Sequence, residues 1–311
     1  MSSLEWLFDL CAVAKASGKS IITDNTPLKN QLPPSKDPCY SAPEGWESRQ
    51  PGDVLRIRST SNLIDIVEGS GASPSGKAAI LSYQFDYNTY NVDSSPSCAL
   101  SGVMAKSEPN LGIKSSSSLI AEMLSFGWIV NNPDHLGPTA AFGASVLAGH
   151  ATLDALRAVH SLISMGGNLG FNTAIWGYSG GSIATFSAAE LQPSYAPELN
   201  ISAAVVGGLV DNISAALDKI NKSTIAGTLI ALLLGITAQY PEERAYLESR
   251  LVLETKDEFT AAMNIEVTQN AGKYSRQHIY AFFIDGGADL RALILQNLYD
   301  KQAELNTETR P

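Results

Sequence analysis

The chain has 311 residues, of which 44% are hydrophobic and 17% are charged. A chain of this length buries enough apolar surface to fold without staples, which excludes an intrinsically disordered, a collagen-like or a disulfide-framework protein. Lysine and arginine total 21 against 31 aspartate and glutamate residues, giving a net charge of −10. Because no basic run offsets this charge, nucleic acid is not expected as a partner.

The N-terminal part, residues 1–52, is expected to form an extension and an arm. The first seventeen residues hold a short apolar stretch that ends in small residues, as in a secretory signal, but Glu5 and Asp9 stand where such a signal is basic or apolar. Residues 20–52 are rich in proline, serine and turn formers, which predicts an extended arm without regular structure.

Cysteine usage predicts neither a metal site nor a redox centre. Cys11, Cys39 and Cys98 allow one intrachain disulfide and one thiol, or three buried thiols. Their spacing matches no zinc or redox motif, so we expect no metal and no other cofactor.

The next segments predict the first elements of a folded core. Residues 53–59 and 77–87 have the composition of β-strands, and a turn cluster at 88–97 closes the second. Four serines at 115–118 precede apolar residues at helical spacing, which indicates the entry of a helix. Residues 127–131 are a short apolar run that predicts another strand.

A regular alternation of strands and helices follows and defines the fold class. Apolar residues between 146 and 163 recur at the spacing of an amphipathic helix. A strand at 172–178, a helix at 180–191 and a strand at 201–210 come next. Successive βαβ units predict an α/β fold with a mainly parallel sheet and helices on both faces.

Residues 213–275 interrupt the alternation and are expected to form a helical cap. An insertion after a strand of a parallel sheet lies over the carboxyl ends of the strands, where such folds bind ligands. The longest apolar run, residues 225–238, is too short to span a bilayer and predicts a buried or interfacial helix. We therefore expect no transmembrane segment.

One more strand is predicted at residues 279–284, followed by a polar helix and a charged tail. The chain is thus divided into the extension at 1–52, the core at 53–212, the cap at 213–275 and the start of the C-terminal part of the core at 276–311.

The motif that carries chemistry is G-x-S-x-G at residues 177–181, read as Gly-Tyr-Ser-Gly-Gly. The bare pattern is a weak signal, but it follows a predicted strand and opens a predicted helix, which is the context of a nucleophile elbow. Such a turn strains its central residue and requires neighbours without bulk. The pattern therefore predicts Ser179 as a nucleophile, with the Gly180 N–H directed at a developing oxyanion.

A serine nucleophile needs a base, and the four histidines fit poorly. In the usual chain order the acid and then the histidine follow the serine, whereas His135, His150 and His160 precede Ser179. His150 and His160 lie on the inward stripe of the long predicted helix, where a core role is expected. His135 lies in a loop that follows a predicted strand. Only His278 follows the nucleophile.

The candidate acids give no better solution. Asp285 and Asp289 follow His278 and would serve only in reversed order. Three acids would keep the usual order with His278: Asp211, Asp218 and Asp257. The favoured interpretation is that the catalytic acid and base lie beyond Pro311 and that the chain is truncated.

Five segments carry a resemblance to a known family: SYQFDYNTYNVDSSPS (82–97), NNPDHLGPTAAF (131–142), ALRAV (155–159), GYSGG (177–181) and QPSYAPELNISAAVVGG (192–208). They resemble the fungal secretory lipases of the lipase A type, and the similarity runs from about residue 34 to about residue 300. The resemblance implies an α/β-hydrolase with a helical cap that is secreted and hydrolyses triacylglycerol or related acyl esters. It also implies contact with lipid surfaces.

The resemblance assigns roles to three residues: Ser179 as nucleophile, Gly180 as one oxyanion-hole amide and Asn88 as the nearest match to the second. It places the loop at 134–138 beside the active site in a structural role. The chain departs from the family pattern where Ser94 replaces an expected cysteine and where a pair of strands between 58 and 77 is missing. The family's catalytic acid and base come from loops downstream of residue 311.

Two other functions stay open on the sequence alone. A non-catalytic protein of the same fold would bind acyl ligands or a partner through the same cleft. An enzyme with the same nucleophile would catalyse acyl transfer or peptide hydrolysis instead, since a fold does not determine a reaction.

Overall fold

A computed structural model describes ten stretches of the chain: 4–9, 22–24, 32–37, 56–66, 79–101, 111–126, 128–164, 171–210, 213–265 and 267–288. Its centre is a four-stranded sheet in the order β5-β4-β6-β7, in which every neighbouring pair is parallel. The strands are β4 (Ala79–Gln84), β5 (Ile129–Asn131), β6 (Asn172–Tyr178) and β7 (Ile201–Gly207). The predicted parallel sheet is confirmed: β6 has the predicted bounds, and the other three strands are somewhat shorter than expected.

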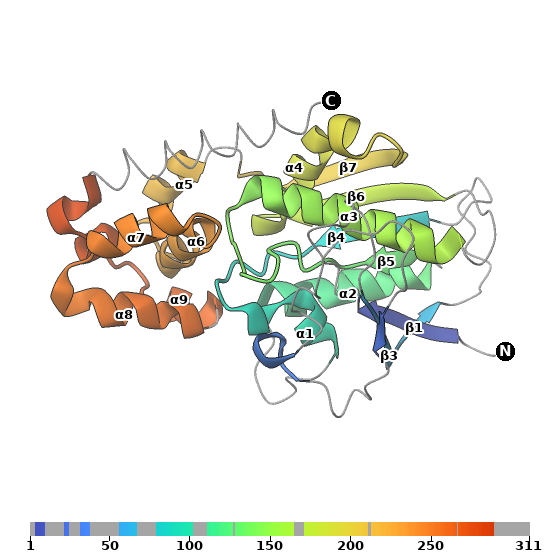
Figure 1. Ribbon diagram of the computed structural model, residues 1–311, viewed down its shortest axis with the longest axis horizontal. Coiled ribbons are helices and arrows are strands. Elements are labelled where there is room, and N and C mark those ends of the chain that lie inside the picture. The colour runs from blue at the N-terminus through green and yellow to red at the C-terminus, as the bar shows by residue number, and fades with distance from the viewer. Residues whose placement is uncertain are drawn as a thin grey trace.

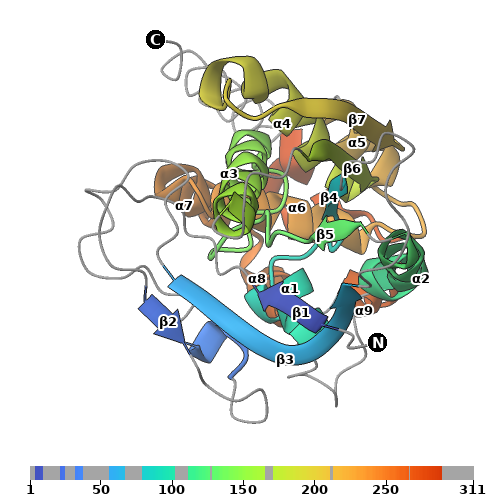
Figure 2. The ribbon, with the colours of Figure 1, turned by 90° about the vertical axis from the view of Figure 1, so that its right-hand side faces the viewer.

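Helices cover both faces of this sheet (Figure 2). Because side chains alternate along a strand, neighbouring residues of β4 enter different parts of the core. Ile80 belongs to the apolar cluster that includes α3 (Ser145–Ser164) and α4 (Gly180–Tyr195), while Leu81 and Tyr83 belong to the cluster that includes α2 (Leu111–Ser125). β4 is thus buried on both faces, as expected of a central parallel strand.

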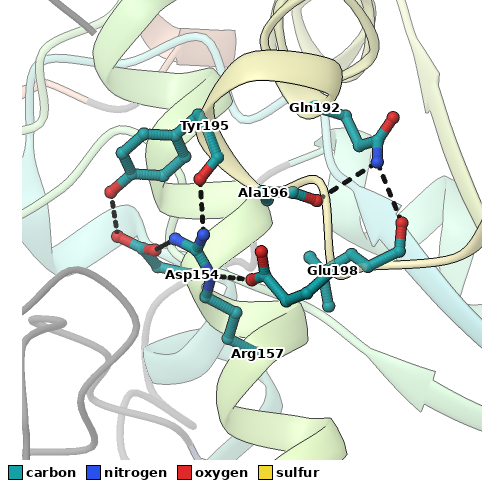
Figure 3. A network of polar contacts seen from close by, with 7 residues as sticks. Asp154, Arg157, Gln192, Tyr195, Ala196 and Glu198 are labelled. Atoms are coloured by element: carbon teal, nitrogen blue, oxygen red, sulfur yellow. Dashed lines mark hydrogen bonds and ion pairs between the residues drawn. The ribbon is translucent and has the colours of Figure 1, made fainter. Parts of the chain in front are cut away.

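A polar network holds the C-terminal end of α4 to α3 (Figure 3). The Arg157 guanidinium pairs with Asp154 at 2.8 Å and with Glu198 at 2.5 Å. The Tyr195 hydroxyl donates to the second oxygen of Asp154 at 2.9 Å. Gln192 donates to the carbonyls of Ala196 and Leu199, which fixes the turn that follows the helix.

The described residues after β7 are mostly helical, and their helices gather at one end of the molecule (Figure 1). They are α5 (Ile213–Ile220), α6 (Gly227–Thr237), α7 (Pro241–Ser249), α8 (Lys256–Ala261) and α9 (Val267–Lys273). Every residue of α6 is buried, which confirms a buried helix within the long apolar run. Across the described stretches, none of the helices has the length and apolar character needed to cross a membrane. The division into core and cap stays a prediction.

The prediction of a strand at residues 279–284 is wrong. Ile279–Phe282 and Ile284–Gly287 form two 3-10 turns, and Phe283 between them makes a single antiparallel bridge with Leu251. Ile279, Tyr280, Phe282 and Phe283 are all buried. Ala281 and Ile284 are exposed, so exposure recurs at every third position, as in a 3-10 turn. All six residues are apolar, so the sequence pattern could not separate a strand from a helical turn.

The arm is also more regular than expected. β1 (Leu4–Asp9) pairs antiparallel with β3 (Arg56–Ile66), and β2 (Ile22–Asp24) pairs parallel with β3. A 3-10 turn at Pro34–Lys36 adds a further element. The expectation of an arm without regular structure is therefore wrong at β2 and at this turn. The partner strand β3 lies far along the chain, where local composition gives no indication of it.

Candidate active site

Ser179 occupies a sharp turn between β6, which ends at Tyr178, and α4, which begins at Gly180. Its backbone angles, φ 52° and ψ −119°, lie in a region that a residue with a side chain rarely adopts. Such a conformation costs on the order of 1–3 kcal/mol and persists only where the surroundings impose it. The Ser179 N–H donates to Gly207 O at 2.9 Å, which ties the turn to the end of β7. The predicted strand–turn–helix context is confirmed.

Three glycines leave room for this turn, and none of them could carry a side chain without displacement. A Cβ on Gly177 would lie 2.3 Å from Gly181 O, and a Cβ on Gly181 would lie 2.0 Å from Gln84 O. A Cβ on Gly180 would lie 1.6 Å from Asn88 Oδ1. The first two contacts involve backbone on both sides, so β4, β6 and α4 meet at the closest distance that their main chains allow.

Asn88 lies in the loop that follows β4, and its carboxamide lies directly against Gly180. Its Oδ1 is buried and has no hydrogen-bond partner in the described part of the chain. The structure thus brings together Ser179, Gly180 and Asn88, the three residues singled out in the sequence.

The loop around Asn88 is held by contacts that were not predicted. The Tyr87 hydroxyl accepts from the Leu136 N–H at 2.8 Å. The Arg244 guanidinium of α7 lies over the Tyr90 ring, 4.9 Å from its centroid. Arg244 is itself fixed by donating to Thr237 Oγ1 at 2.9 Å and to a carbonyl at the end of α6. In the sequence, the two tyrosines near Asn88, Tyr87 and Tyr90, are the one feature that could have indicated these contacts.

His135 and His150 both have environments that keep the imidazole neutral. His135 is buried, with its ring edge-on to Tyr87 at 5.0 Å between centroids, and burial lowers its pKa to about 3. His150 stacks on Tyr195 at 4.0 Å, and burial together with the Arg157 charge lowers its pKa to about 4.

His160 and His278 also have neighbours other than Ser179. A ring nitrogen of His160 lies 3.0 Å from Thr173 Oγ1, and the exposed His278 lies edge-on to Tyr280. Within the described ranges, no hydrogen bond joins Ser179 Oγ to a histidine. The structure therefore assembles no Ser–His pair from these residues.

The candidate acids are likewise engaged elsewhere or exposed. Asp285 is exposed and accepts from the Arg250 guanidinium at 2.8 Å. Asp218 and Asp257 are exposed, and Asp211 and Asp289 lie outside the described residues. Asp134 accepts from Ser97 N–H at 2.9 Å and so lies at the start of α1 (Pro96–Ser101), while burial raises its pKa. This contact agrees with a structural role for the loop at 134–138.

Comparison with known proteins places the chain in a family. The sequence model of the secretory lipase family matches residues 105–297. The chain is 48% identical to a probable trichothecene esterase of Stachybotrys chartarum, over 98% of this chain and 69% of that protein. It is 34% identical to lipase A of Arthroderma benhamiae, over 79% of this chain and 60% of that protein.

The fold is similar to a solved structure of the same kind. The crystal structure of Candida antarctica lipase A matches with a TM-score of 0.70 and 23% identity, over 86% of this chain and 68% of that one. This likeness confirms the predicted α/β-hydrolase fold. The chain spans between 53% and 69% of the length of eight curated relatives that it matches. By these matches the chain belongs to the secretory lipase family.

Proposed function

We propose that this chain carries the nucleophile and the oxyanion hole of a serine ester hydrolase, with Ser179 as the nucleophile. The relatives described above are named as a lipase and an esterase, and the chain is a member of a family of carboxylic ester hydrolases. The observation that carries the proposal is the strained turn at Ser179, which joins β6 to α4 between three glycines. Strain of this kind is typical of sites where a side chain must be presented to a substrate.

In the proposed reaction, Ser179 Oγ attacks the ester carbonyl carbon and negative charge develops on the carbonyl oxygen. The Gly180 N–H stands at the start of α4, where the helix leaves its first amide donors without an intrahelical acceptor. The positive end of the helix dipole adds to the stabilisation of the oxyanion. Asn88 lies beside Gly180 and is proposed as the second contributor. The catalytic base takes the proton of the Ser179 hydroxyl during the attack and gives it to the alkoxide as the ester C–O bond breaks, so that an alcohol leaves and the acyl group stays on Ser179. A water molecule, activated by the same base, then releases the carboxylic acid and restores the serine.

We propose that the catalytic acid and base come from residues outside the described ranges. The described histidines contact tyrosine rings or Thr173, and no hydrogen bond in the described ranges joins one of them to Ser179. Removing the base from a serine triad lowers turnover by about a millionfold. Ser179 in the described surroundings alone should therefore react slowly.

The helices α5–α9 are proposed to form the cap, at residues 213–275. Two contacts support their position over the carboxyl ends of the strands. Gly235 of α6 packs on Phe142, in the segment after β5, where an added Cβ would lie 2.5 Å from Phe142 N. Arg244 of α7 lies over Tyr90, in the loop after β4. Because α6 is buried on all sides, acyl chains or a lipid surface would reach it only after the surrounding helices part.

Two substrate classes are proposed, because a specific observation favours each. The sequence resemblance and the lipase relatives favour triacylglycerol or a related acyl ester. The 48% identity to a probable trichothecene esterase over nearly the whole chain favours the acyl ester of a polycyclic alcohol such as a trichothecene. Release of fatty acid from a triacylglycerol emulsion, compared with deacylation of an acylated trichothecene by the same preparation, separates the two.

Export from the cell is also proposed, on the basis of membership of a secretory family. Secretion of the full-length product from its natural host, detected in the culture medium with an antibody, tests this independently of activity.

The nucleophile is tested by reaction with a fluorophosphonate, which phosphonylates activated serines. In the full-length product, which brings the proposed acid and base, intact-mass measurement and peptide mapping should place one adduct on the peptide that contains Ser179, and Ser179→Ala should abolish it. An adduct on another serine, or none after prolonged incubation, would overturn the proposal and favour a non-catalytic acyl-binding protein.

A further inference from the structure

We propose that Gln84 and Thr185 are positioning residues for Ser179, acting through a buried hydrogen bond that fixes the first turn of α4 against the end of β4. This inference rests on the proposed function, because it concerns how the nucleophile is held. Neither side chain is expected to touch the substrate.

The two residues end a chain of buried polar side chains that crosses the sheet. Asn131 Nδ2 donates to Ser82 Oγ at 3.2 Å, and Gln84 Nε2 donates to the same oxygen at 2.8 Å. Thr185 Oγ1 then donates to Gln84 Oε1 at 2.7 Å. Ser82, Gln84 and Thr185 are fully buried, and Asn131 is 6% exposed. One polar chain therefore joins β5, β4 and α4 inside the core.

The end of this chain lies directly behind the nucleophile turn. Thr185 stands one helical turn after Gly181, and its Oγ1 is also 3.1 Å from Gly181 O. From the opposite side, a Cβ on Gly177 would lie 2.4 Å from the same hydroxyl. The Thr185 hydroxyl thus occupies the point where the residues before and after Ser179 come together with Gln84.

A hydrogen bond does at this point what an apolar contact would not do. Apolar contacts are non-directional, so an aliphatic side chain would let α4 shift along β4 without losing much contact. The bond between Thr185 and Gln84 instead prescribes a distance and an angle. Ser179 has a backbone conformation that persists only where its surroundings determine it. The polar chain fixes the backbone conformation of Ser179 from the side of the turn that faces the core.

The experiment compares three variants that differ by one hydroxyl or one methyl group. Thr185→Val replaces the hydroxyl by a methyl group of similar size and leaves Gln84 Oε1 without its donor. Thr185→Ser restores the hydroxyl. Thr152→Val is the matched control, because Thr152 is a fully buried threonine of α3 whose Oγ1 has no hydrogen-bond partner among the described residues. The readout is the second-order rate constant for phosphonylation of Ser179 in the full-length product, at a temperature where circular dichroism shows every variant folded.

We expect Thr185→Val to lower this rate by about tenfold or more, given how steeply reactivity depends on placement of the nucleophile. Thr185→Ser should return it to near the wild-type rate, and Thr152→Val should leave it unchanged. If Thr185→Val melts at a lower temperature but reacts like the wild type, the bond is only structural and the inference is overturned. If the wild type itself forms no adduct at Ser179, the proposed function fails, and the positioning role fails with it.

Discussion

Replacing Gly181 by alanine tests whether the reactivity of Ser179 depends on the close approach of α4 to β4. In an ordinary helix this substitution would stabilise the protein by up to about 1 kcal/mol, because alanine is the better helix former. Here the added Cβ would lie 2.0 Å from Gln84 O, whereas Cβ atoms essentially never approach another heavy atom closer than 3.0 Å. Because Gln84 O belongs to the main chain and the added Cβ is fixed to the backbone of α4, neither atom can move by a side-chain rotation. The first turn of α4 must therefore move away from β4 by about 1 Å.

Gly181→Ala is therefore expected to lower the free energy of unfolding, whereas helix propensity alone would raise it. Overpacking of this kind costs about 1–3 kcal/mol of the free energy of unfolding, and a displacement of about 1 Å lowers reactivity by about 100-fold. The assays are urea denaturation and the rate of phosphonylation of Ser179. Gly272→Ala is the control, because Gly272 lies in α9 and a Cβ added there would have nothing within 4 Å, so the change should be neutral or stabilising. If Gly181→Ala resembles this control in both assays, the crowding argument is wrong.

Three further changes test other parts of the structure. Burial lowers the pKa of His135 to about 3, so at acidic pH the unfolded chain binds a proton that the folded chain does not bind, and stability falls as pH drops below about 6.5. His150, with a pKa lowered to about 4, acts in the same direction. Denaturation at pH 7 and at pH 4 should show that His135→Phe reduces the loss of stability by about 3 kcal/mol, whereas an unchanged loss would contradict this assignment. Arg244→Met removes the cation over Tyr90 and should slow phosphonylation of Ser179 even at temperatures where the variant is fully folded. A variant with the melting temperature and the phosphonylation rate of the wild type would contradict a link between α7 and the loop after β4. Tyr195→Phe removes the bond to Asp154 and should cost about 1 kcal/mol with an unchanged rate; a slower reaction would show that this end of α4 affects the elbow.

The elements that sequence patterns predicted correctly are those whose periodicity is local. The long helix Ser145–Ser164 and the strand Asn172–Tyr178 carry their inward-facing residues at regular spacing within one segment. The run at 279–284 consists of six apolar residues without a polar position among them, so its sequence shows no such spacing, although Ala281 and Ile284 are exposed. The strand Ile22–Asp24 forms through pairing with β3, which local composition does not reveal.

The same distinction applies to the candidate site. Ser179 and its glycines form one short motif, so the sequence located them, and Asn88 was found through family resemblance. The bond between Thr185 and Gln84 joins residues 101 positions apart, and the contact between Arg244 and Tyr90 spans a still longer stretch of the chain. Contacts of this kind depend on which strands become neighbours, and a single sequence gives that order only after the fold is known.

The position of β7 at the end of the sheet order has a practical consequence for handling this protein. Its residues 202–205 are exposed and include Val205, and among the described strands β6 is its sole neighbour. Where no strand covers it, the edge of β7 presents a row of amide and carbonyl groups with which a strand from elsewhere in the full-length protein, or from another chain, can pair. Preparations at high concentration should therefore be checked by light scattering for edge-to-edge association, and a lysine in place of Val205 offers a direct way to suppress it.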